Sequence, residues 1–169
     1  MKMHSMNSDK QITKHVQASY HTMYRNPRSR DLAIKAALLI ERSLPHFRQL
    51  LDLPDTLEIR IAGIKGRAHG RYYAAETRVE IDNNIIGRHA SMLEVVAHEL
   101  VHAEQYHQKR LQNRLRVGKW IHLWNGEVDT NRGSTYAAYR KQPWEVEAFS
   151  RQQGLAAKVI EAMGGINAN

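Results

Sequence analysis

The sequence predicts a single domain of the α+β class. Three observations support this: apolar residues at helical spacing over residues 30–43, alternating apolar and polar residues over 57–82, and helical spacing again over 91–109. The chain has 169 residues, of which 42% are hydrophobic, enough for one core but not for two. We expect residues 29–169 to form this domain and residues 1–28 to be an N-terminal arm, either loosely ordered or a short helix.

The first half of the domain is predicted to be a helix followed by three strands. The helix covers residues 30–43 and ends near Pro45, because proline disrupts a helix interior. Residues 57–61 alternate apolar and polar side chains and predict a half-buried strand, and residues 68–75 and 77–82 follow as two more. These strands are expected to form a small sheet that is mainly antiparallel.

A second, longer helix is predicted over residues 91–109. Ser91 followed by Glu94 is typical of a capping box, in which each side chain bonds a backbone N–H at the start of a helix. Apolar side chains then recur at helical spacing through the segment, at Met92, Leu93, Val96, Ala97, Leu100 and Val101.

Strand, loop and helix are predicted to follow. Residues 119–124 alternate large side chains and predict a short strand that closes at Asn125-Gly126, and the polar residues 127–135 predict a loop. Pro143 suits the first turn of a final helix, which ends at Gly164-Gly165. Trp120 and Trp124 are candidates for lining a cleft beside a strand that pairs with an extended peptide, the alternative being that they pack in the core.

The most specific motif lies within the second helix. His98-Glu99-Leu100-Val101-His102 has the zincin spacing, with two histidines on one helix face where both imidazoles can bind one Zn²⁺. Glu99 lies between them and suits a general base acting on a metal-bound water. The alternative is a helix with two solvated or hydrogen-bonded histidines. Since the chain has no cysteine, any metal site must use nitrogen and oxygen ligands.

A catalytic zinc needs a third protein ligand. The metzincin pattern is excluded, because Gln105 and Gln108 occupy the positions of its glycine and third histidine. A glutamate on a later helix is the natural choice, and Glu145 and Glu147 both lie at the start of the final helix. Residues two apart on a helix face nearly opposite sides, so only one of them can bind the metal directly.

Three segments together resemble small zinc metallopeptidases of bacteria and their phages, similar in outline to the SprT-like and ImmA/IrrE-like zincins. They are His98 to Ala103, Trp124-Asn125-Gly126 and Tyr139-x-x-x-Pro143-Trp144-Glu145-x-Glu147-Ala148, and the resemblance covers residues 56–151. It implies a zincin-like fold in which an N-terminal helix and a small sheet precede the active-site helix, and the C-terminal helix carries the third ligand.

The resemblance also implies which residues act. By position, Glu145 is the third ligand beside His98 and His102, with Glu147 and, as in SprT-like proteins, His122 as alternatives. Phe149 departs from the ImmA/IrrE-like pattern, in which an asparagine commonly follows the alanine.

The implied activity is zinc-dependent hydrolysis of a protein or peptide substrate. Zn²⁺ lowers the pKa of its bound water towards 7, Glu99 accepts the proton, and the hydroxide attacks a carbonyl polarised by the metal. Tyr139 is the preferred further donor to the oxyanion, with Tyr136 and His122 as alternatives. The alternative for Tyr139 is a purely structural role, in which its ring packs beside Trp144.

Charge adds a second class of function. The net charge is +8, and the basic residues are densest just after the second helix, at Lys109, Arg110, Arg114, Arg116 and Lys119. Nucleic acid is therefore a candidate partner. The alternative function is a non-catalytic scaffold that binds nucleic acid or a protein through this basic surface. Glu99 favours an enzyme over this alternative, because a scaffold needs no general base.

Location is predicted from what the sequence lacks. No run of eighteen apolar residues occurs, and residues 1–21 have no apolar signal-peptide core. We expect a soluble cytoplasmic protein with no membrane partner, in keeping with the lack of cysteine.

Overall fold

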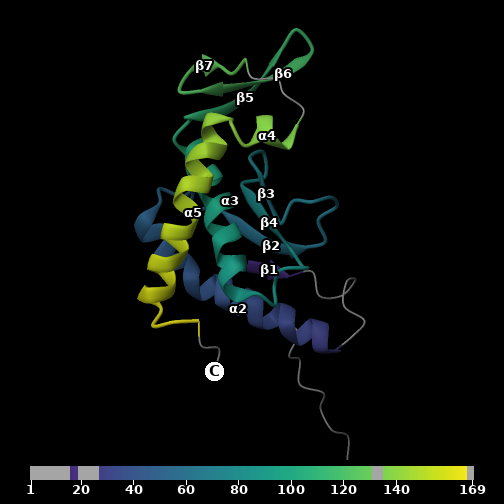
Figure 1. The fold of residues 1–169 in the computed structure, drawn as a ribbon, viewed down its shortest axis with the longest axis vertical. Helices are drawn as coiled ribbons and strands as arrows, with labels where there is room; N and C mark the ends of the chain where they lie inside the picture. Colours follow the sequence, from purple (N-terminus) through teal and green to yellow (C-terminus); the bar gives the residue numbers. More distant parts are fainter. Residues whose placement is uncertain (1–15, 19–26, 131–134, 167–169) are drawn as a thin grey trace, which may run out of the picture.

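The computed structural model describes residues 16–18, 27–130 and 135–166, and it is of the α+β class as predicted. Figure 1 shows α3 between the first sheet and α5, with α2 across one end and the second sheet at the other. Within the described ranges, no helix combines the length and apolar character needed to cross a bilayer. The elements in order are β1 (Val16–Ala18), α2 (Pro27–Leu50), β2 (Glu58–Ala62), β3 (Gly70–Tyr73), β4 (Arg78–Asp82), α3 (His89–His107), β5 (Leu111–Arg116), β6 (Lys119–Trp124), β7 (Glu127–Val128), α4 (Tyr136–Tyr139) and α5 (Pro143–Ala162).

Helix α2 is longer than predicted at both ends. The expected stop near Pro45 is wrong, because the helix continues through this proline to Leu50. An interior proline removes one hydrogen bond and costs about 3 kcal/mol. Leu44 just before the proline and Phe47 and Leu51 after it are buried, and burial of side chains this large offsets that cost.

The first sheet has the strand order β1-β2-β4-β3. The expectation of a mainly antiparallel sheet is wrong here, since β1 pairs with β2 and β2 with β4 in parallel, and only β3 and β4 are antiparallel. Strand β4 returns from its hairpin with β3 and lies between β3 and β2. Alternation identified the buried side chains, such as Ile59 opposite Val79 and Ile61 opposite Ile81, but alternation carries no information on strand direction.

Strand β1 falls within the segment predicted to be an arm. Residues 1–15 and 19–26 of that segment lie outside the described residues. Val16–Ala18 adds a parallel strand at the edge of the first sheet, beside β2.

Helix α3 begins two residues earlier than the predicted capping box. The N-cap is Arg88 and no side chain caps it, so the prediction that Ser91 and Glu94 form the cap is wrong. The turn after β4 sets this start: the backbone N–H of Arg88 donates to Ile85, and that of Met92 donates to Arg88. Met92 and Leu93 are fully buried as a result, and the helix enters the core at once.

The second sheet is antiparallel throughout, in the order β5-β6-β7. Strand β6 has the predicted bounds, Lys119–Trp124. Its partner β5 lies in the basic segment that follows α3, where no strand was predicted. The predicted loop over 127–135 includes the two residues of β7, and its residues 131–134 lie outside the described ranges.

Helix α5 begins and ends as predicted. Pro143 occupies its first turn, where the missing N–H has no partner to lose. At the other end, Gly164 and Gly165 have positive φ angles, and their N–H groups donate to Glu161 and Ile160 in the pattern of a Schellman cap. The helix packs along α3, which fixes its first turn beside the His-Glu-x-x-His segment.

Candidate metal centre

Helices α3 and α5 bring His98, His102 and Glu145 together in the interior. One potential ligand atom from each lies within 4.8 Å of the others, and all three residues are buried. The Nε2 atoms of the two histidines are 3.2 Å apart, and each lies 3.3 Å from an oxygen of Glu145. These three side chains could hold a metal ion.

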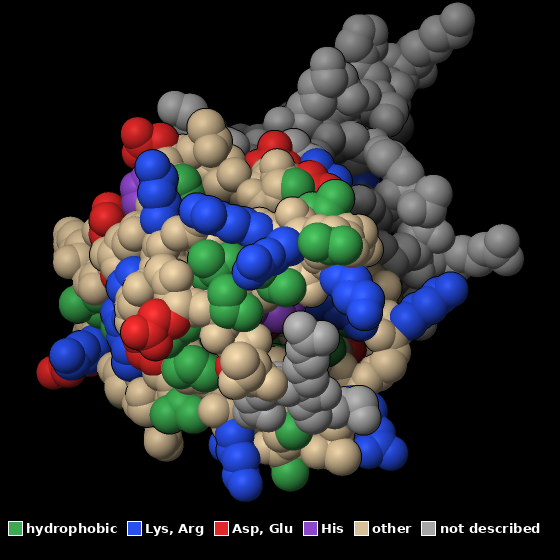
Figure 2. Space-filling model, turned by 90° about the horizontal axis from the view of Figure 1, so that it is seen from above, with side chains coloured by type: hydrophobic (Ala, Val, Ile, Leu, Met, Phe, Trp, Pro, Cys, Tyr) green, Lys and Arg blue, Asp and Glu red, His purple; other side chains and the backbone are tan. Residues whose placement is uncertain are grey.

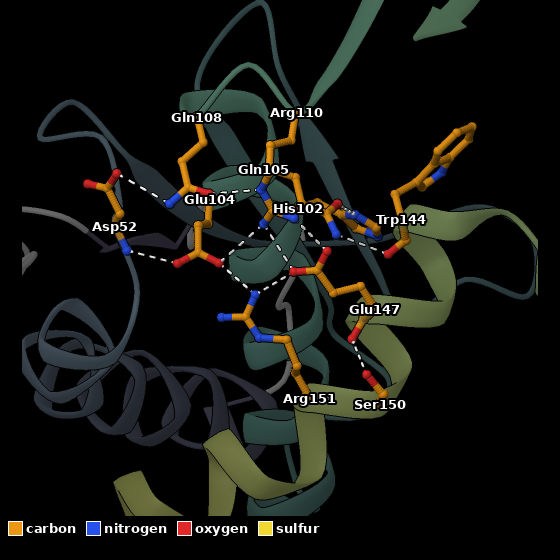
Figure 3. A network of polar contacts seen from close by, with 10 residues as sticks. All are labelled: Asp52, His102, Glu104, Gln105, Gln108, Arg110, Trp144, Glu147, Ser150 and Arg151. Carbon is orange, nitrogen blue, oxygen red and sulfur yellow. Dashed lines mark hydrogen bonds and ion pairs between the residues drawn. The ribbon is translucent and has the colours of Figure 1, made fainter. Parts of the chain in front are cut away.

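Two glutamines orient the histidines. His98 Nδ1 lies 2.9 Å from Gln152 Oε1, and His102 Nδ1 lies 2.9 Å from Gln105 Oε1. Since an amide oxygen only accepts, these bonds favour the tautomer with the proton on Nδ1 and leave both Nε2 lone pairs aimed at Glu145. Gln105 in turn donates to the backbone carbonyl of Trp144, which ties α3 to the residue before the third side chain (Figure 3). Such outer partners are what metal-binding histidines require.

Gln152→Leu is expected to weaken metal binding by about 10–100-fold, because His98 loses the acceptor that fixes its tautomer and ring orientation. Competition with a zinc chelator would measure the change. The neighbouring Gln153 is exposed, so Gln153→Leu serves as the matched control and should keep the wild-type affinity. Equal affinities in all three proteins would contradict a role for Gln152 in metal binding.

The electrostatic environment of His98, His102 and Glu145 favours a positively charged group among them. Burial acts to lower the pKa of His102, but the hydrogen bond that its protonated ring donates to Glu145 and the charge of Glu99 outweigh burial, so the pKa is raised. Burial acts to raise the pKa of Glu145, yet contacts with His102, His98 and Tyr139 bring this pKa down to about 2. Within the described residues, Glu145 Oε2 is a buried oxygen without a hydrogen-bond partner. An ionised carboxylate facing two imidazole lone pairs is the donor set that a divalent cation with nitrogen and oxygen ligands needs.

Glu99 is buried in the same pocket as His102 and Glu145. Burial raises the pKa of its carboxyl, with the two histidines opposing that shift, and the backbone N–H of Tyr72 in β3 donates to it. A carboxylate with a raised pKa is better suited to accept a proton near neutral pH than an exposed glutamate.

Gly70 in β3 makes room for Glu99. A Cβ at this position would lie 2.7 Å from Glu99 Cγ and 2.7 Å from Val95 Cγ1, closer than such atoms approach one another. From the sequence, this glycine is only one residue of the strand predicted over residues 68–75. Its proximity to Glu99 depends on β3 lying over α3, which no local pattern predicts.

Gly70→Ala is therefore expected to displace Glu99 and to lower any hydrolytic activity about 10²-fold, the cost of an ångström-scale misplacement of a catalytic group. Steady-state kinetics together with zinc content would test this, since the metal ligands themselves are not crowded. Gly154→Ala in α5 is the control: a Cβ there meets nothing within 4 Å, so activity should be unchanged and stability slightly raised. Full activity in Gly70→Ala would exclude this role.

Tyr139 lines the same pocket, and its hydroxyl donates to Glu145. Burial and the charge of Glu145 raise its pKa, which keeps the hydroxyl protonated and able to donate. Trp144 lines the pocket as well.

The two alternative third ligands lie elsewhere. Glu147 accepts hydrogen bonds from Arg110 at 2.7 and 3.0 Å and from Arg151 at 2.7 Å (Figure 3). His122 is exposed and lies 2.6 Å from Asn113 Oδ1, with its ring 5.3 Å from that of Trp144. Neither belongs to the cluster of potential ligands found among the described residues.

Glu147 instead belongs to an ion-pair network that joins three elements. Arg151 also bonds Glu104 at 2.7 Å, and Glu104 accepts the backbone N–H of Asp52 after α2. The network fixes α5 against α3 close to the metal cluster, because Glu104 and Glu147 are two residues from His102 and Glu145 respectively.

The tryptophans of β6 do not line the pocket. Trp120 is exposed, Trp124 packs beside Trp144 with ring centroids 6.3 Å apart, and neither belongs to the buried core. Phe149, the departure from the resembling pattern, packs on His98 with centroids 4.4 Å apart. It holds the ring of a potential ligand by contact.

Comparison with known proteins yields no relative: no protein-family model, curated protein or solved structure matches this chain.

Proposed function

We propose that the chain is a zinc-dependent metallopeptidase, with His98, His102 and Glu145 as metal ligands and Glu99 as general base. The observation that supports this most is the convergence of three buried ligand atoms with a second buried carboxylate in one pocket. Three protein ligands with one position left open are typical of catalytic rather than structural zinc.

Each residue has a distinct role in the proposed reaction. Bound Zn²⁺ would supply Lewis acidity, which acidifies a water molecule and polarises the scissile carbonyl. Glu99 takes the proton from the attacking water and passes it to the leaving amine. Tyr139 is the proposed donor to the oxyanion, since its hydroxyl lies in the pocket and stays protonated. Trp144 and Tyr72 line the pocket beside these groups.

Zinc content and proteolysis measured on the same preparation test this proposal. We expect purified protein to contain zinc by elemental analysis and to cleave casein, to lose both with a strong chelator, and to regain both when zinc is returned. Thermal stability should fall on metal removal, because a ligand that binds only the folded state stabilises it. A protein that takes up no zinc would disprove the metallopeptidase. Zinc uptake without cleavage of casein or a diverse peptide library would support a non-catalytic scaffold instead.

A further inference from the structure

The hairpin of β5 and β6 ends in exposed apolar side chains. Leu115 is 63%, Val117 95% and Trp120 70% exposed, and Leu115 lies directly opposite Trp120 in the strand register. We call these three residues the hairpin tip. Figure 2 looks onto this end of the molecule, where hydrophobic side chains are interspersed with those of Lys and Arg.

The turn at the tip uses an unfavourable residue. Val117 and Gly118 both have positive φ, 46° and 71°, as a two-residue type I′ turn requires. A β-branched residue is disfavoured in this conformation. The next turn of the same sheet has the same signs of φ at Asn125 and Gly126, and uses the favoured asparagine. The tip therefore carries an apolar side chain at the expense of turn stability.

Cations flank the tip. Arg116 lies opposite Lys119 across the two strands, and Arg114 is two residues before Arg116. Like charges directly opposite one another destabilise a hairpin. In the ranges that the structure describes, no carboxylate forms an ion pair with any of the three. Because side chains alternate along a strand, these three cations point to the face of the hairpin opposite Leu115 and Trp120.

One face of the hairpin leads from the tip to the pocket. Leu115 and Trp120 share this face with the pairs Asn113–His122 and Leu111–Trp124, because side chains two apart point to the same side. Leu111 lines the pocket, and the rings of His122 and Trp124 both approach Trp144, which also lines it. Four residues separate Leu111 from Leu115, a distance of about 13 Å at the rise of a β-strand.

From this continuity we infer that the hairpin tip binds the peptide substrate itself, at an apolar side chain about four residues beyond the pocket. The inference rests on the proposed peptidase function. An extended substrate has the same rise per residue as the strand, so a chain held in the pocket reaches the tip after about four residues. The tip would thus select substrates, while the metal cluster cleaves them.

Cleavage-site profiling of a peptide library tests the inference. Mass spectrometry of a proteome-derived library cut by wild type should show an enriched apolar residue at a fixed position, four or more residues to one side of the scissile bond. In the double variant Leu115→Ala/Trp120→Ala this enrichment should disappear, and kcat/KM for long peptides should fall about tenfold. Short peptides that end before the tip should be cut at the wild-type rate, with zinc content unchanged.

The matched control is Leu38→Ala/Leu50→Ala, which removes exposed leucines from α2 and should keep the wild-type profile. A wild-type profile without this preference, or its retention in the tip variant, would overturn the inference while the peptidase stands. Absence of zinc and cleavage in wild type would remove the peptidase proposal as well.

A second readout needs no turnover. The catalytically silent Glu99→Gln protein should retain intact library peptides with the same pattern, and the added tip substitutions should release them. If a single-stranded oligonucleotide or anionic vesicles bound through the tip, and peptides did not, the inference would be wrong.

Discussion

Glu99→Gln is expected to lower kcat/KM for casein hydrolysis by roughly 10²–10⁴-fold, the range that a positioned general base contributes. Glutamine keeps the shape of the side chain and can still accept the N–H of Tyr72, but it cannot take a proton from water. Zinc content should be unchanged, because Glu99 is not among the three clustered ligands. Kinetics and elemental analysis of one preparation would separate loss of chemistry from loss of metal.

Glu94→Gln is the control for this experiment. It makes the same substitution on the same helix, at a residue that does not line the pocket, and should leave activity unchanged. If Glu99→Gln retained full activity with zinc bound, Glu99 could not be the general base. If it lost zinc as well, the carboxylate would have to act on the metal itself.

The second large effect is a contrast between two glutamates of α5. Glu145→Ala is expected to weaken zinc binding by more than the 10–100-fold typical of losing an outer partner, because it removes a ligand. Glu147→Ala should leave the zinc affinity unchanged. It removes the hydrogen-bond acceptor of Arg110 and Arg151, so unfolding free energy should fall by about 1–3 kcal/mol.

Zinc titration and denaturant unfolding of both variants would measure this contrast. Since unfolding of each protein should be compared without metal, a chelator is included in the stability measurement. Zinc loss in Glu147→Ala with retention in Glu145→Ala would exchange the two assignments. Loss in both would show that the network around Glu147 sets the position of α5 so strictly that the ligand cannot be held without it.

Local sequence signals predicted the elements of the site better than its surroundings. Helical spacing placed His98 and His102 on one face, and Pro143 placed Glu145 at the start of a helix, because both depend on neighbours within a few residues. Gln152, by contrast, contacts His98 across 54 positions, and Gly70 meets Glu99 only because β3 packs over α3. Such contacts come from tertiary packing, for which spacing carries no signal.

The errors have the same origin. A capping box at Ser91 and a stop at Pro45 are sound local preferences. The turn after β4 overrides the first, and burial of large apolar residues nearby overrides the second. The strand β5 was missed because its basic residues resemble those that favour a helix C-terminus, and only pairing with β6 reveals it.

In the chain, the second sheet comes between the two helices that carry the potential metal ligands, and this order has a consequence for folding. Residues 103–144, which include β5, β6 and β7, lie between His102 and Glu145 in the chain. An ion held by both side chains ties the ends of this segment together, so while the ion is bound the segment gains less conformational entropy when it opens locally. Bound metal would then act as a cross-link between the two ends of residues 103–144. Its removal should leave this segment more open to limited proteolysis than the remainder of the chain.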